Sequence, residues 1–262
     1  MLSCRSFAIL SAMVVISVLP LGTALAVDFR IGAGLGVKPD YEGSDDYEFA
    51  PNWLLSATNL YHPDTYVIIG GPILRSNFVP DPNIRLGLSG QYVGNRHHVH
   101  DSRVDDMRGV DDSLLLGVIG GWDFLPEPNR SLSVTLDVRA DTLNGNGVLI
   151  TPRLTYSGPL GGDWNIKTEV YSTWASDDYM SEYYGVSSAN AARSGLKSFN
   201  ADDSFKEVGL ALDVNYRISQ RWTATGVAVL SRLIGDAADS PVVDDRGDKN
   251  QFYLGALVSF GF

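Results

Sequence analysis

The chain has 262 residues, 44% of them hydrophobic, and its 31 acidic and 20 basic side chains give a formal net charge of −11. So acidic a chain is not expected to bind nucleic acid, because the phosphate backbone would repel it. Its one cysteine, Cys4, lies near the N-terminus, so the remaining residues offer no disulfide and no thiolate for zinc.

The first 26 residues have the pattern of a cleavable secretory signal peptide. Arg5 supplies the positive charge, residues 7–19 form an apolar run, and Ala24-Leu25-Ala26 is a small-x-small cleavage site. The run is too short for a transmembrane helix, and no later stretch reaches the roughly 20 apolar residues that such a helix needs. We therefore expect export and a single mature domain, 27–262.

Along this domain, apolar and polar residues alternate with a period of two, as in strands with one apolar face. The alternation is strict in 29–37, 84–92, 132–140 and 208–216, and less regular in 49–57, 114–124, 148–156, 164–174 and 222–232. Most are as long as the roughly 9–11 residues with which a tilted strand crosses a membrane. With no membrane helix predicted, a spanning structure must be a closed barrel.

The last twelve residues, 251–262, form the most regular strand. One face is wholly apolar, the other is small or polar, and the chain ends on Phe262. This pattern is typical of the closing strand of a transmembrane barrel. We assign barrel assembly to residues on both of its faces: Tyr253, Gly255, Val258, Phe260 and Phe262.

The connections are of two kinds. Those at 61–64, 79–82, 126–129, 158–163 and 219–220 are short and mostly rich in Pro or Gly, whereas those at 38–48, 95–112, 176–204 and 234–250 are long and acidic. Outer-membrane barrels have short periplasmic turns and long outer loops, and an even number of strands. Splitting 65–78 at Gly70-Gly71, a hairpin signal, predicts twelve antiparallel up-and-down strands. Ten strands remain the alternative if 65–78 forms a loop.

Charged residues of both signs fall on the predicted lumen face. Mixed sign argues against a strongly charge-selective pore and favours a hydrogen-bonded, partly filled interior, although a substrate pathway stays open as an alternative. The residues are Arg30, Arg85, Asp137, Arg139, Arg153, Lys167, Glu169, Asp213 and Arg217.

Neither catalysis nor a metal site is predicted. His97, His98 and His100 lie among aspartates in an outer loop, but their spacing matches no defined metal site. His100-Asp101-Ser102 is the only hint of a serine nucleophile with its base, and it lies in an acidic loop rather than on a strand. We expect no cofactor.

Two outer-loop segments resemble the signature loops of the MipA/OmpV family of outer-membrane proteins. The first runs through Glu182-Tyr183-Tyr184-Gly185-Val186 and Ala192-Arg193-Ser194-Gly195-Leu196, and the second through residues 235–243, including Asp239-Ser240-Pro241. The glycine-rich opening at 32–37 fits as well, so the resemblance spans about 29–262.

This resemblance implies a barrel in the Gram-negative outer membrane, surrounded by its lipids. It also implies a scaffold that joins a lytic transglycosylase to a murein-synthesising penicillin-binding protein. It implies no catalytic residues. The alternative function is a narrow uptake channel for small solutes or antibiotics. Because aromatic residues are unusual in free solvent, we expect 182–204 to fold back as a plug, with Tyr183, Tyr184 and Leu196 packed and Arg193 against lumen carboxylates.

Overall fold

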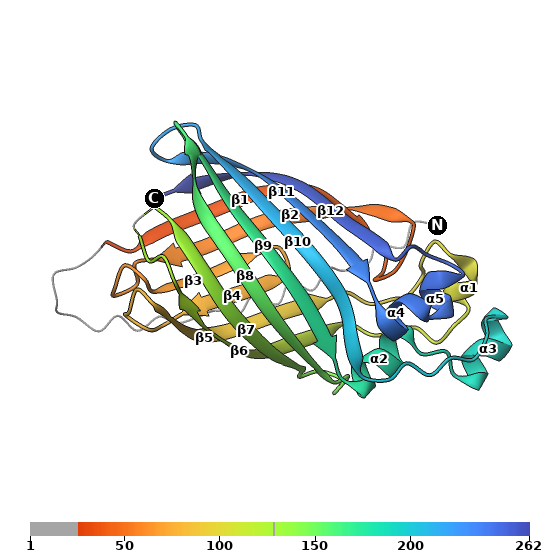
Figure 1. Cartoon of the computed structure of the whole chain (residues 1–262). Coiled ribbons are helices and arrows are strands. Elements are labelled where there is room, and N and C mark those ends of the chain that lie inside the picture. Colours follow the sequence, from red (N-terminus) through yellow and green to blue (C-terminus); the bar gives the residue numbers. More distant parts are fainter. Residues whose placement is uncertain (1–25, 128) are drawn as a thin grey trace.

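The computed structural model describes residues 26–127 and 129–262, so the predicted signal peptide lies, apart from Ala26, outside the described residues. The chain forms a closed antiparallel barrel in which each strand pairs with the next and the last returns to the first (Figure 1). This confirms the predicted fold and its twelve strands. They are β1 (Asp28–Pro39), β2 (Tyr47–Thr58), β3 (Tyr66–Gly70), β4 (Ile73–Asn77), β5 (Ile84–Val93), β6 (Ser113–Asp123), β7 (Ser131–Asp141), β8 (Val148–Gly161), β9 (Trp164–Ala175), β10 (Ser204–Arg217), β11 (Trp222–Leu233) and β12 (Asn250–Gly261).

The alternation of the sequence sets the direction of the side chains. Large apolar residues such as Leu35, Val118 and Leu254 are about half exposed on the outer surface of the barrel, while their sequence neighbours face inward. An apolar outer band with a polar interior is the arrangement that a strand-built membrane protein needs. Among the described residues, no helix is long and apolar enough to cross a membrane.

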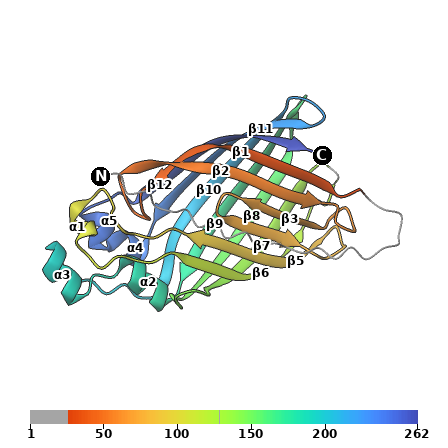
Figure 2. The same cartoon turned by 180° about the vertical axis from the view of Figure 1, so that it is seen from behind.

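The two ends of the barrel differ as the sequence predicts. The start of β1 and the C-terminus lie together at the end that carries the short turns, where the Phe262 backbone N–H donates to Phe29 O at 3.0 Å. The long acidic loops gather at the opposite end (Figures 1 and 2). We call these the periplasmic and outer ends, following the rule for bacterial barrels.

Short helices, which the sequence analysis did not predict, fold the outer loops into a layer. They are α1 (Ser102–Asp105), α2 (Asp177–Tyr184), α3 (Ser188–Ser194), α4 (Gly235–Asp239) and α5 (Pro241–Asp244). Side-chain caps define several of their starts: Asp101, Ser187 and Ser240 each accept hydrogen bonds from backbone N–H groups of the first helical turn.

The barrel wall is lower at one place. β3 and β4 have five residues each and turn at Gly71-Pro72, which confirms the predicted short hairpin. β2 pairs with β3 only from Leu54 onward, and Gly71 N donates to Trp53 O at 2.8 Å. Among the described residues, 47–52 therefore have no strand partner on that side, and Pro51 lies within this free edge.

The glycines of β1 allow the barrel to close tightly. A Cβ atom at Gly34 would lie 1.9 Å from the backbone oxygen of Ala256 on β12. No other residue fits this approach, so the small-residue face of β1 is required by contact between strands as well as by space in the lumen.

Candidate functional site

An ion pair crosses the bore. Arg75 on β4 donates to both carboxylate oxygens of Glu169 on β9, at 2.5 and 3.1 Å. In the ring of strands, four strands separate β4 from β9 on one side and six on the other, so the two residues reach from nearly opposite walls. A bidentate guanidinium–carboxylate pair is the strongest and most directional of the common ion pairs. It ties the walls together at this level.

Further charges surround this bridge. Lys167 contacts Glu169 at 2.5 Å and Asp213 at 3.8 Å, and Arg153 lies 3.7 Å from Glu169. Arg153 also lies 3.7 Å from Asp137, the neighbour of Arg139 at 3.3 Å. Positive and negative side chains thus alternate across the β7–β10 wall. They compensate one another's buried charges and fill this half of the bore.

The other half of the bore is lined more lightly. At mid-height, the inward-facing positions on β10 to β12 and β1 include several small or aliphatic residues that are partly exposed, whereas those on β7 to β9 are mostly buried. These lightly lined positions are Ala211, Val227, Val229, Gly255 and Gly34. Solvent therefore reaches this side of the interior more than the other.

Three of the nine predicted lumen charges lie near the periplasmic end of the barrel, away from this network. Arg217 pairs with Asp163 at 2.8 Å at the periplasmic rim, with 62% of its side chain exposed, so it is not part of the network. Arg85 also lies at the periplasmic end, where it binds Asp123 at 2.9 Å. Arg30 donates to Thr223 Oγ1 at 2.9 Å across the β12 strand. Arg75, the centre of the bridge, was not predicted.

Arg85 and two asparagines brace the three longest periplasmic turns, whose described residues are 59–65, 78–83, and 124–127 with 129–130. Arg85 joins Asp123 to Asp64, which is 3.8 Å away. Asn77 Nδ2 donates to Asp64 O at 2.7 Å, and Asn83 Nδ2 donates to Asp123 O at 2.9 Å. Because each bond joins different turns or their flanking strands, the three turns form one connected surface, which we call the braced turns.

At the outer end, α2 lies over the mouth of the barrel. Its Tyr179, Met180, Tyr183 and Tyr184 are all at most 5% exposed. They pack with buried apolar residues from the upper ends of four strands, from the outer loops, from α4 and from α5: Leu115, Leu149, Ala175, Leu233, Val110, Ala201, Ala237, Ala238 and Val243. We call this layer the outer cap. Residues from β6, β8, β9 and β11 meet in it with the outer loops, so it covers the mouth on that side of the ring.

Polar contacts fix α2 in this position. Arg96 Nη1 donates to Tyr183 O at 2.7 Å, and Tyr183 Oη donates to Ser113 Oγ at 3.1 Å. Tyr179 stacks on Tyr183 with ring centroids 4.2 Å apart. Burial raises the pKa of the Tyr183 phenol to about 12 and raises those of Tyr179 and Tyr184 well above their usual value, so all three stay neutral.

The signature-loop residues hold the cap together. Ser240 Oγ donates to Tyr184 O at 2.6 Å, and Pro241 begins α5, whereas Asp239 is exposed near Lys249 at 3.8 Å. Gly195 ends α3 with φ +71°, a conformation that favours glycine. In a second apolar cluster, Val186 and Leu196 pack with Tyr41, Val99, Val104, Met107 and Val242.

The expected contact between Arg193 and lumen carboxylates is wrong. Its Nε donates to Asp106 O at 3.2 Å, and its Nη2 donates to Asn190 Oδ1. Arg193 lies on α3, which packs on the loop above the cap rather than inside the barrel, so its charge stays near solvent. Its neighbour Ser194 is buried and donates to Asn190 O at 2.8 Å.

The closing strand follows the predicted alternation. Tyr253 and Gly255 face inward, whereas Val258 and Phe262 are exposed on the outside. Phe260 packs edge-on against Trp222 and Phe262, with centroids 5.0 and 5.1 Å away. These aromatic rings gather near the periplasmic end, at the level where membrane proteins place interfacial aromatic girdles.

The histidine and serine candidates have structural partners. His100 Nδ1 lies 3.1 Å from Asp40, and His97 Nε2 lies 2.9 Å from Asp111. Asp101 caps α1 and accepts from Arg246 Nε at 2.9 Å. Over the described residues, no group of three or more His, Cys, Asp or Glu side chains is placed to hold a metal ion.

Comparison with known proteins gives consistent matches. The family described as MltA-interacting protein MipA matches residues 31–262. MltA-interacting protein of Escherichia coli K12 is 28% identical over 221 residues, which cover 82% of this chain and 84% of that protein. Outer membrane protein OmpV of Vibrio cholerae is 33% identical over 90 residues, about a third of either chain.

Solved outer-membrane barrels give weaker matches. An outer membrane channel from Pseudomonas putida F1 covers 94% of this chain and 97% of its own at 14% identity, with a TM-score of 0.45. Outer membrane protease OmpT from Escherichia coli has 11% identity and a TM-score of 0.35, and covers 90% of this chain and 96% of its own. The barrel and the named relatives together place the chain in the Gram-negative outer membrane.

Proposed function

The chain belongs to the MipA family, and from that premise we propose that it is a capped, non-enzymatic barrel that holds a lytic transglycosylase at the periplasmic face of the outer membrane. A murein-synthesising penicillin-binding protein would join the same assembly. The single observation that carries the proposal is the outer cap, in which Met180 and Tyr184 are fully buried over the mouth of the barrel. A covered mouth suits a protein that acts through its surface.

The braced turns supply the surface. Their described residues number nineteen, close to the roughly 20–30 that a standard protein interface takes from each partner. Tyr61 and Leu125 are exposed on them by 57% and 41%, between exposed prolines such as Pro63 and Pro80. Exposed apolar side chains on a connected frame can bind a partner at a low cost in ordering.

The test is retention of the barrel by an immobilised lytic transglycosylase of the relatives' type. We expect the wild-type barrel in detergent to be retained and the double variant Tyr61→Ser/Leu125→Ser to be lost. The matched control is Leu143→Ser, which changes a residue that is 60% exposed on an outer loop. Equal retention of the double variant and the control would place the interface elsewhere and refute the role of the braced turns.

The second candidate, a narrow solute channel, is favoured by the partly exposed half of the bore beside Ala211 and Val229. Planar-bilayer recording separates the two functions. Reproducible single-channel steps that disappear in Arg85→Gln or Arg139→Gln would support the channel. Silent bilayers with a barrel that still retains the transglycosylase support the scaffold.

A further inference from the structure

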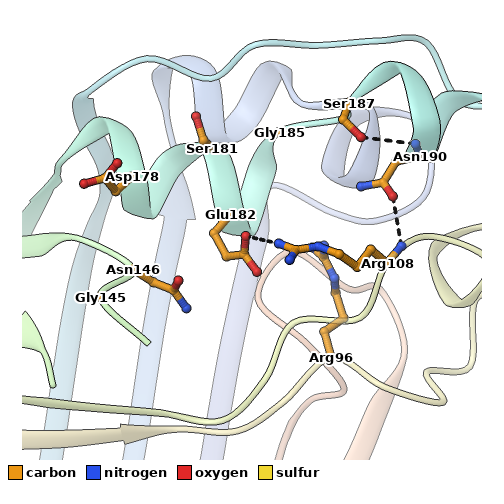
Figure 3. Close-up of a pocket in the computed structure, with 10 residues that line it drawn as sticks. All are labelled: Arg96, Arg108, Gly145, Asn146, Asp178, Ser181, Glu182, Gly185, Ser187 and Asn190. Atoms are coloured by element: carbon orange, nitrogen blue, oxygen red, sulfur yellow. Dashed lines mark hydrogen bonds and ion pairs between the residues drawn. The ribbon is translucent and has the colours of Figure 1, made fainter. Parts of the chain in front are cut away.

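A cavity of about 510 Å³ opens on the outer face, apart from the bore and the braced turns (Figure 3). It lies between α2, the start of α3 and the loops at 94–112 and 142–147. All of its lining residues are glycine, polar or charged, and the ones that matter here are Arg96, Arg108, Asn146, Ser181, Glu182 and Asn190. Its volume lies within the roughly 300–1,000 Å³ of small-molecule sites, but its chemistry suits a hydrophilic ligand.

Arg96 is the unusual member of the lining. It is only 7% exposed, and its hydrogen bond to Tyr183 O is with a neutral carbonyl group. Among the described residues, no carboxylate lies within 4.0 Å of its guanidinium, and its buried Nε has no hydrogen-bond acceptor. Burial lowers the pKa of Arg96. The carboxyl end of α2 offers only about half an elementary charge, so this cation is poorly compensated.

A second guanidinium lies beside it. Arg108 pairs with Glu182 through Nη2, and its backbone N–H donates to Asn190 Oδ1 at 2.9 Å. In Figure 3, Arg96 and Arg108 approach each other near Glu182, while Asp178 lies one helical turn earlier on α2, farther from both. The side chain of Arg108 is 67% exposed, and a guanidinium has five N–H donors, so it can hold Glu182 and still bind a ligand. The lining thus contains two guanidinium groups and two carboxylates, and the Glu182 carboxylate pairs with Arg108.

We propose that this cavity binds a small hydrophilic oxyanion, a carboxylate or phosphate group on a molecule about the size of a monosaccharide. Planar guanidinium groups match both oxyanions with paired hydrogen bonds. Arg96 would bind the anion from the floor and Arg108 from the rim, while the Asn146 amide and the Ser181 hydroxyl would bind the remaining polar groups. The bound anion would compensate the buried charge of Arg96.

Titration calorimetry on the whole barrel in detergent tests this site, with inorganic phosphate, glucuronate and uncharged glucose as probes. We expect phosphate or glucuronate to bind and glucose not to bind. Arg96→Gln and Arg108→Gln should each weaken binding at least about tenfold, because each removes a charged donor. The control is Arg103→Gln on α1, an exposed outer-face arginine outside the cavity, which should bind like the wild type.

The choice of probe identifies the ligand class: a phosphate preference indicates a phosphorylated ligand, and a glucuronate preference indicates a sugar acid. If Arg96→Gln does not fold, the Arg108→Gln variant still tests the proposal, because Arg108 is exposed and its substitution should not prevent folding. The proposal is overturned if the wild type binds neither anion, if glucose binds as well as glucuronate, or if Arg103→Gln weakens binding as much as Arg108→Gln.

Discussion

Arg75 and Glu169 join nearly opposite walls of the barrel, five strands apart along the shorter path around the ring, through two hydrogen bonds of 2.5 and 3.1 Å. Lys167 and Arg153 also face this carboxylate. The Glu169 carboxylate therefore compensates the positive charges of three side chains, Arg75, Lys167 and Arg153. The pair divides the bore into a filled half and a more open half, and the loss of either partner would leave charge buried without compensation.

The first prediction is that Glu169→Gln strongly destabilises the barrel. The side chain of Glu169 is 6% exposed, and removing one partner of a buried ion pair costs about 3–5 kcal/mol, because the remaining charge stays uncompensated. The measurement is urea-induced unfolding in lipid vesicles. Arg217→Gln is the control, since its pair with Asp163 is largely exposed and should contribute less than about 1 kcal/mol.

The double variant Arg75→Met/Glu169→Met adds a sharper comparison. It removes both charges of the bridge and fills the space with apolar atoms, so it should be more stable than Glu169→Gln. A double variant that is less stable than Glu169→Gln would show that the bridge contributes more than mutual compensation of its two charges.

The strands could be predicted from the sequence because the lipid bilayer imposes a strict alternation of apolar and polar residues on each transmembrane strand. Every residue that faces the membrane must be apolar, so the alternation in 29–37 or 132–140 identifies both the strand and its two faces. Gly70-Gly71 located the hairpin that fixes the number of strands. The acidic loops and Pro-rich turns separated the two ends, since turn chemistry is local.

The bridge and the cap depend on contacts between residues far apart in the sequence. Arg75 follows two consecutive apolar residues, Ile73 and Leu74, so alternation did not identify its face, and its partner lies 94 residues away. The outer helices have four to eight residues, too few to form alone in water, so packing rather than propensity determines them. Arg217 fits the alternation of β10, but it is the last residue of that strand and lies at the periplasmic rim.

The second prediction concerns the outer cap at alkaline pH. The phenol pKa of Tyr183 is raised from 10.0 to about 12, and those of Tyr179 and Tyr184 are raised well above 10.0, chiefly by burial. A raised pKa means that the neutral phenol stabilises the folded cap. This stabilisation is complete below pH 10 and is lost as the pH rises through about 12.

Tyrosinate absorbance during a pH titration measures this effect. We expect a late, cooperative group of tyrosines, including those of α2, to ionise as the cap opens, with new exposure to proteolysis between residues 176 and 203. Tyr179→Phe/Tyr183→Phe should remove two phenols from the late group. Ionisation of all tyrosines near pH 10 in one step would contradict the buried positions of these rings.

The third prediction is that Arg85→Gln loosens the braced turns without disturbing the cap. Arg85 is the charged group that joins Asp64 to Asp123, so its loss should increase amide hydrogen exchange in 59–65 and 124–130. Exchange in α2 should stay at the wild-type rate, because α2 lies at the opposite end of the barrel. Arg30→Gln, which removes another inward arginine that bonds Thr223 instead, is the matched control.

The last prediction concerns Pro51 on the free edge of β2. Trp53 O accepts from Gly71 N, and alternate residues of an antiparallel strand direct their backbone groups to the same side, so residue 51 faces the gap above the short hairpin. Proline has no N–H there, and such residues protect sheet edges from pairing.

Pro51→Val restores the missing donor beside Phe49, which is 81% exposed. We expect the β2 edges of two barrels to pair, giving concentration-dependent dimers in detergent by analytical ultracentrifugation. Pro80→Val, in an exposed turn at the periplasmic end, should remain monomeric like the wild type. A monomeric Pro51→Val barrel at all concentrations would mean that the low wall is already covered, and that the proline is there for its fixed backbone angle rather than for its missing hydrogen-bond donor.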